Sequence, residues 1–162
     1  LKGIGCRFIF LLSIIFSMPA ICINPTDNLD AELLIKLNEQ NQDVRLFVSD
    51  LIDKKTIETF KGKKAIGDIN DDSHISTASS GAYCGIFFEQ DYSTQRQIFL
   101  EAIKNSTLQR IIWVSPEKPS EQIMSIPNLV YIFYKDKVKS HTIILDYEDR
   151  DEIKTEVINL VD

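Results

Sequence analysis

Residues 82–88 read Ala-Tyr-Cys-Gly-Ile-Phe-Phe, an almost uninterrupted apolar run. A short run without polar alternation is typical of a strand covered on both faces, as in a parallel sheet between helices. Runs rich in β-branched and aromatic residues at 44–49 and 111–114 predict two further strands. Amphipathic patterns from about 27 to 38 and from about 93 to 104 predict helices between them.

This alternation of strand and helix predicts an α/β domain, with a mostly parallel sheet of about four or five strands and helices on both faces. Residues 141–146 and 157–161 predict two more strands. The segment 129–138 is ambiguous, because its residue types favour a strand whereas its apolar spacing also fits a helical face. The polar stretch 61–80 predicts a long loop.

The amino-terminal segment has the pattern of a secretory signal peptide. Lys2 and Arg7 precede an apolar run at 8–16, and the small residues Ala20 and Cys22 suit a cleavage site before Ile23, with cleavage after Ala20 as the alternative. A membrane anchor would need about 20 apolar residues, and this run is shorter. We therefore expect a signal peptide at 1–22 and one α/β domain at 23–162, secreted or on the extracellular side of the plasma membrane.

The charge and the cysteines exclude several classes of protein. Removing 1–22 would take away two basic residues and change the net charge from −6 to −8, which disfavours nucleic acid as a partner. No later segment is apolar enough to span a membrane. With Cys6 and Cys22 removed, Cys84 would stand alone, so we expect no disulfide framework and a small buried thiol.

No motif for catalysis, a cofactor or a metal ion is present. The chain lacks Gly-x-Gly-x-x-Gly, and Asp68 stands where the lysine of a phosphate-binding loop would follow 62–67. His74 and His141 are too few and too isolated for a metal site. We predict no catalytic, cofactor-binding or metal-binding residue. Asn105, in Asn-Ser-Thr, is a candidate for N-glycosylation.

Acidic residues gather where the predicted strands end. Ligands of parallel α/β sheets bind at the carboxyl ends of the strands. These ends are expected at 49–50, 89–91, 115–117 and 146–148, and they are rich in carboxylates. A ligand at that edge would be cationic or bound through a metal ion.

Several parts of the chain are together similar to the extracellular amino-terminal region of divergent insect ionotropic receptors. These parts are the signal peptide, the leucine-bearing first helix, strand 44–49 and the tracts 110–115 and 128–146. These are chemosensory relatives of ionotropic glutamate receptors. The resemblance implies that 129–138 is helical. It also implies a noncatalytic extracellular domain or fragment, partnered by receptor subunits or the rest of a membrane receptor. A free secreted α/β binding or interaction protein and a secreted enzyme are the alternatives.

Overall fold

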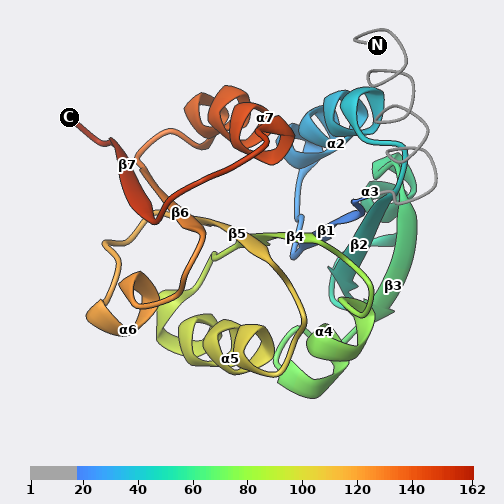
Figure 1. Cartoon of the computed structure of the whole chain (residues 1–162). Helices are drawn as coiled ribbons and strands as arrows, with labels where there is room; N and C mark the ends of the chain where they lie inside the picture. Colours follow the sequence, from blue (N-terminus) through green and yellow to red (C-terminus); the bar gives the residue numbers. More distant parts are fainter. Residues whose placement is uncertain (1–17) are drawn as a thin grey trace, which may run out of the picture.

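The chain forms a seven-stranded sheet with the strand order β3-β2-β1-β4-β5-β6-β7 in a computed structural model that describes residues 18–162 (Figure 1). All six pairings of neighbouring strands are parallel. The strands are β1 (Ala20–Ile23), β2 (Val44–Ser49), β3 (Lys63–Gly67), β4 (Cys84–Phe88), β5 (Arg110–Ser115), β6 (Leu129–Tyr134) and β7 (Glu156–Leu160). The predicted α/β class and parallel sheet are confirmed, but the sheet is wider than the four or five strands expected.

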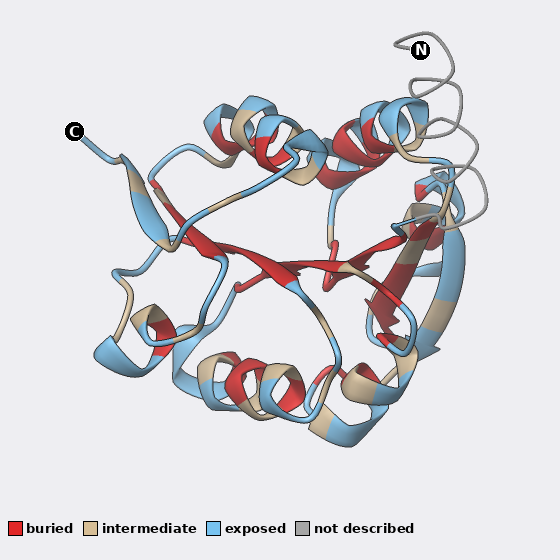
Figure 2. Ribbon diagram, viewed as in Figure 1, coloured by how far each residue is buried: buried red, intermediate tan, exposed pale blue. Residues whose placement is uncertain are grey.

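Helices cover both faces of this sheet. The connecting helices are α2 (Asn28–Gln40), α3 (Lys54–Thr59), α4 (Asp72–Ala78), α5 (Tyr92–Lys104), α6 (Glu121–Met124), the 3-10 helix η1 (Lys137–Ser140) and α7 (His141–Asp149). Helices α2, α3 and α7 pack on one face, and α4, α5 and α6 on the other (Figure 1). Buried residues run along the central strands, whereas the edge strands β3 and β7 are largely exposed (Figure 2).

An aromatic row crosses the second face and joins three neighbouring strands. Phe87, Trp113 and Tyr131 stand side by side in register on β4, β5 and β6. The ring centroids of Phe87 and Trp113 are 6.3 Å apart, and those of Trp113 and Tyr131 are 6.2 Å apart. Such offset stacking adds to the area that these rings bury. Trp113 is therefore part of the core, with its side chain fully buried.

The first strand lies where the predicted signal peptide ends. Ala20–Ile23 pairs with β2 on one side and β4 on the other, and all four residues are buried. Cleavage at the predicted boundary before Ile23 would remove three of the four residues of β1, and the boundary itself stays a prediction. The remainder of the predicted leader, residues 1–17, lies outside the described residues, and export stays a prediction.

Two further predictions fail for identifiable reasons. Residues 61–80 form β3 and α4 instead of a polar loop, because an edge strand and a short helix bury few side chains and need little apolar sequence. Residues 141–146 belong to α7 instead of a strand. Ile144 and Tyr147 lie three apart and are both buried on the first face, so packing on the sheet outweighs the β propensity of Ile143 and Ile144.

The ambiguous segment 129–138 begins with a strand, β6, which is the structure that its residue types favoured. Leu129–Tyr134 pairs with β5 and β7, and a 3-10 turn follows at Lys137. The helical assignment that the receptor resemblance implied is wrong here. The final strand at 157–161 is confirmed as β7, shifted by one residue. Among the described helices, none is long and apolar enough to cross a membrane.

Strand β1 supplies the first test of this architecture. A chain that begins at Met18 should fold, whereas one that begins at Ile23 should lose cooperative unfolding, because two parallel strand pairings disappear together. Natural domains have a net stability of only about 5–15 kcal/mol, which such a loss exceeds. Circular dichroism during thermal unfolding measures the difference. Equal melting temperatures for the two chains would contradict the placement of β1.

Candidate functional site

The order of the strands reverses at β1, which lies between β2 and β4. In open parallel sheets, ligands bind at such a point, in the crevice outside the carboxyl ends of the strands. Three of the four acidic tracts expected at this edge do lie where a strand ends. These are 49–50 at the end of β2, 89–91 after β4 and 115–117 at the end of β5. The fourth tract, 146–148, lies in α7 and is not part of the edge.

The loop after β1 contains a residue in the left-handed region. Asn24 has a φ of 71° and is buried. Asparagine is among the few non-glycine residues that adopt this conformation at low cost. Its Nδ2 donates to the carbonyl oxygen of Phe88 at 2.9 Å, so the side chain joins the ends of β1 and β4 at the switch point.

Two carboxylates occupy the start of α2. Asp27 is the N-cap, and its Oδ1 accepts from the backbone N–H of Asp30 at 3.0 Å. Asp30 is completely buried, and its Oδ2 accepts from the backbone N–H of Thr26 at 2.8 Å. Negative charge is favourable at a helix amino terminus, and here side chains of the chain itself provide it.

Lys137, from the segment after β6, neutralises Asp30. Its Nζ lies 2.8 Å from Oδ2 of Asp30, with 11% of the side chain exposed, and it stands 5.1 Å from the centre of the Phe88 ring. A buried carboxylate of this kind needs a partner, since an unpaired buried charge is costly. The ion pair thus connects the segment that follows β6 to the start of α2.

Further polar groups surround this ion pair. Within residues 18–162, Oδ1 of Asp30 and Nε2 of His141 are buried without a hydrogen-bond partner. Burial lowers the pKa of His141, which Asp30 opposes. Burial, together with the charges of Asp30, Asp27 and Glu89, raises the pKa of Tyr134 to about 12. At neutral pH the uncharged forms of His141 and Tyr134 therefore stand around the Asp30–Lys137 pair.

A second polar network joins β4, β5 and α5. Glu89 is fully buried, and Arg96 donates to its two carboxylate oxygens at 3.1 and 2.8 Å. Ser115 donates to Glu89 at 2.6 Å and accepts from the backbone N–H of Glu117. Arg96 also donates to the Tyr131 hydroxyl at 2.6 Å. Each polar side chain of this network has partners, so it fixes the carboxyl edge in one arrangement.

The Tyr131 hydroxyl both accepts and donates a hydrogen bond, and it is a weak acid. Burial raises its pKa to about 12, and the hydroxyl donates to the carbonyl oxygen of Glu117. A tyrosine with this pKa stays protonated at neutral pH. The network is consequently a structural clamp on the edge of the crevice.

The residues singled out from the sequence do not form a reactive centre. Cys84 is buried, as expected, and Cys22 is a second buried free thiol in β1. Burial raises the pKa of both thiols, so neither is a nucleophile at neutral pH. No cluster of three potential metal ligands occurs in the described part of the chain. Asn105 ends α5 and is exposed, and its glycosylation stays a prediction.

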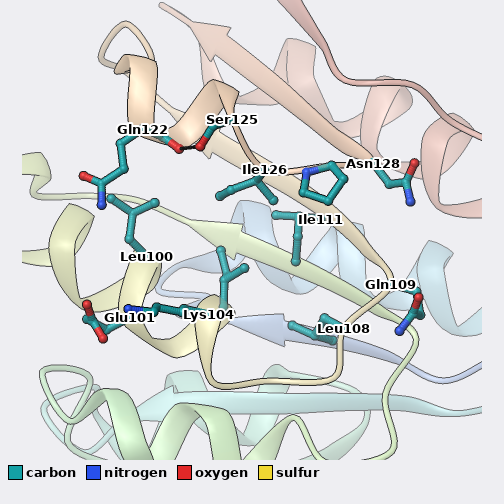
Figure 3. A pocket seen from close by; sticks show the side chains of 12 residues that line it. Leu100, Glu101, Lys104, Leu108, Gln109, Ile111, Gln122, Ser125, Ile126 and Asn128 are labelled. Carbon is teal, nitrogen blue, oxygen red and sulfur yellow. Dashed lines mark hydrogen bonds between the residues drawn. The ribbon is translucent and has the colours of Figure 1, made fainter.

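A cavity of about 420 Å³ lies at the opposite edge of the sheet (Figure 3). It lies between α5, which has 13 residues, and the short helix α6, which has four. Leu100, Leu108, Ile111 and Ile126 line it, and Glu101 and Lys104 of α5 also contribute. A cavity of this size is large enough for a small molecule. It is remote from the switch point and from both buried polar networks, so we place the functional site at the carboxyl edge.

Comparison with solved structures identifies the architecture. The chain is similar to a short-chain dehydrogenase/reductase from Veillonella parvula DSM 2008, with a TM-score of 0.67, 12% identity and coverage of 90% of this chain and 94% of that one. The chain has a Rossmann-type fold. A short-chain dehydrogenase/reductase from the same organism, in complex with NADP, matches with a TM-score of 0.64 and 9% identity over 89% and 94% of the two chains.

A nucleoside-diphosphate-sugar epimerase from Pseudomonas aeruginosa matches this Rossmann-type domain with a TM-score of 0.58 and 15% identity. The match covers 72% of this chain and 52% of the epimerase. No protein-family model and no curated protein sequence matches the chain. At these identities the similarity establishes the fold.

These matches correct the functional expectations. The three solved structures described above are two short-chain dehydrogenases/reductases and an epimerase, and not amino-terminal regions of ionotropic receptors. The receptor resemblance is wrong, and so is the function of a noncatalytic chemosensory receptor fragment that it implied. The expectation of a protein that is not an enzyme is contradicted as well, because these relatives in fold are enzymes. The alternative of a free secreted binding protein gains no support.

The Rossmann-type fold implies a nicotinamide dinucleotide, and half of the site does not fit one. Such folds hold the diphosphate on glycines and free N–H groups at the start of the first helix. Here residues 24–30 contain no glycine, and the N–H groups of Thr26 and Asp30 donate to the carboxylates of Asp30 and Asp27. Two like charges about 5 Å apart repel by roughly 3 kcal/mol at an effective dielectric constant of about 20. The loop after β1 is therefore unsuited to a diphosphate.

The nucleoside half of the site does fit. In dinucleotide-binding folds an acidic residue beyond the first helix accepts from the ribose hydroxyls. Asp50 directly follows β2 and is exposed, and its side chain makes no hydrogen bond to another residue in 18–162. Leu51 beside it is 87% exposed and offers apolar surface to a base. The acids around Asp50 were expected from the sequence, but Asp30 and Lys137 were not.

The Glu89–Arg96 pair gives a prediction for stability. Arg96→Met should lower the free energy of unfolding by about 3 kcal/mol, because a buried carboxylate loses its cation. Glu89→Gln together with Arg96→Met should recover more than half of this loss, since no charge then remains. Urea denaturation measures both. Arg150→Met, which removes an exposed ion pair, should leave the urea midpoint unchanged. A single variant as stable as the native protein would contradict the clamp.

His141 gives a prediction for pH dependence. Burial lowers the pKa of His141 from 6.5, and the positive charges of Lys137 and Lys36 also lower it. The negative charges of Asp30 and Asp27 act in the opposite direction. The unfolded chain then takes up the proton more readily, so the free energy of unfolding should fall as the pH drops below about 6.5. His141→Gln should flatten this slope between about pH 7.5 and 5.5, while exposed His74→Gln should keep it. A slope that survives His141→Gln would contradict the prediction.

Proposed function

We propose that this chain, which has the fold of nucleotide-dependent oxidoreductases and epimerases, binds a nucleoside at the carboxyl edge of the sheet. The observation that carries the proposal is the position of Asp50, an exposed carboxylate directly after β2 and beside the switch point. Carboxylates at this place accept hydrogen bonds from ribose hydroxyls in dinucleotide-binding folds.

The surroundings of Asp50 support a nucleoside. The aliphatic side chain of Leu51 is almost fully exposed next to it, and the base of a nucleoside would cover apolar surface of this kind. Asp27 and Asp68 are exposed near the ends of β1 and β3 and make the edge negative. A negative edge favours a neutral or cationic nucleoside over a phosphorylated one. This agrees with the cationic preference expected from the acids at the strand ends.

The fold neighbours support the ligand class. One of them is a dehydrogenase/reductase in complex with NADP, and another is an epimerase of nucleoside-diphosphate sugars. Both kinds of ligand contain a ribonucleoside. Because the residues after β1 do not fit a diphosphate, these neighbours support a nucleoside and not a whole dinucleotide as the ligand.

Calorimetric titration with adenosine tests the proposal. Adenosine should bind the native protein, and Asp50→Asn should weaken this binding by about tenfold, the loss expected for a hydrogen bond to a charged group. The exposed residue Asp149, on α7, supplies the matched control, so that Asp149→Asn should leave the affinity unchanged.

The ligand can be varied as well as the protein. 2′-Deoxyadenosine should bind the native protein about as weakly as adenosine binds the Asp50→Asn variant, because each change removes one partner of the same hydrogen bond. Absence of adenosine binding at millimolar concentration would contradict the proposal, and so would equal affinity of the native protein and the Asp50→Asn variant.

A further inference from the structure

We infer that the carboxylate of Asp30, paired with Lys137, takes the place of a ligand's diphosphate at the start of α2, and that Asp27 and Asp30 together restrict the site to nucleosides without phosphate. This inference rests on the proposed function for the nucleoside part. It makes Asp27 and Asp30 specificity-determining residues, acting through the charge and the hydrogen bonds that they place in the crevice.

The hydrogen bonds supply the first part of the argument. A phosphate at a helix amino terminus is bound by backbone N–H groups. In this chain the N–H groups of Thr26 and Asp30 donate to Asp30 and Asp27, at 2.8 and 3.0 Å. A diphosphate would have to break both hydrogen bonds and displace both carboxylates before it could accept from the same donors.

The ion pair supplies the second part. Lys137 pairs with Asp30 at the start of α2, with its Nζ 2.8 Å from Oδ2 of Asp30, so this cation is not available to a diphosphate while the pair is intact. Asp30 is fully buried and Lys137 nearly so, so the pair is not a solvated surface contact. Oδ2 of Asp30 thus already has a backbone donor and a cation, while its Oδ1 has no hydrogen-bond partner within residues 18–162.

The backbone supplies the third part. Asn24 holds the left-handed turn that a glycine usually makes in a dinucleotide-binding loop. The path of the chain from β1 into α2 is thus kept, while side chains occupy the space that glycines leave open. This combination predicts that diphosphate binding returns when the two carboxylates are removed and Lys137 is kept.

The test compares the native protein with Asp27→Gly/Asp30→Gly, using adenosine, NAD⁺ and inorganic pyrophosphate as separate probes in calorimetry. The native protein should bind NAD⁺ no more tightly than adenosine and should not bind pyrophosphate. The variant should bind NAD⁺ at least about tenfold more tightly than the native protein and should bind pyrophosphate, with its adenosine affinity changed by less than about twofold. Adding Lys137→Met should abolish the gain.

Matched controls separate this effect from helix capping and from folding. Asp71 caps α4 in the same way, so Asp71→Gly should not create pyrophosphate binding. If circular dichroism shows that the glycine variant is unfolded, Asp27→Ser/Asp30→Asn keeps polar side chains and removes the charges. That variant should bind NAD⁺ at least about threefold more tightly than the native protein.

Three outcomes would overturn the inference. These are pyrophosphate binding by the native protein, native NAD⁺ binding tenfold tighter than adenosine binding, and no gain in a folded variant. If adenosine binds neither protein, the proposed function fails. The pyrophosphate titrations still decide the inference about Asp30, because that probe contains no nucleoside.

Discussion

The parallel pairing of β1 with both β2 and β4 is the constraint on which the remaining architecture depends. Because β1 lies between them, the chain builds the sheet outward in two directions, toward β3 and toward β7. The reversal opens a crevice at the carboxyl edge of the sheet, and the loop after β1 enters α2 beside it. Asn24 then joins the ends of β1 and β4 through its side chain, so the strand also determines the shape of the site.

The carboxylate of Asp30 connects this scaffold to the chemistry of the site. It is buried at the helix start, accepts from the backbone and is neutralised by a lysine that follows β6. Residues from both halves of the sheet therefore meet at one ion pair. A buried pair contributes more to specificity than to stability when it excludes another ligand, and here it stands where a diphosphate would bind.

Much of the fold could be predicted from local patterns. Strands β2, β4 and β5 are buried, and their apolar runs are unmistakable. Helices α2 and α5 carry a clear apolar face. The edge strand β3 and the short helix α4 were missed because each buries few side chains. Helix α7 was mistaken for a strand because its isoleucines favour β structure until packing on the sheet is known.

The candidate site was only half visible in the sequence. The acids at the ends of β2, β4 and β5 follow apolar runs, and this made the carboxyl edge predictable. The loop after β1 was not predictable in the same way, because the apolar segment that precedes it resembles a leader and residues 20–22 were assigned to it. Lys137 lies far from Asp30 in the sequence, and no local pattern reveals their contact.

A crystal structure grown in the presence of excess NADP⁺ is the most direct test of the central claim. The account predicts that the Asp30 carboxylate accepts from the N–H of Thr26 and from Lys137 at hydrogen-bond distance, with no diphosphate at the start of α2. A diphosphate bound to the N–H groups at that helix start, with Asp30 displaced from Lys137, would contradict it.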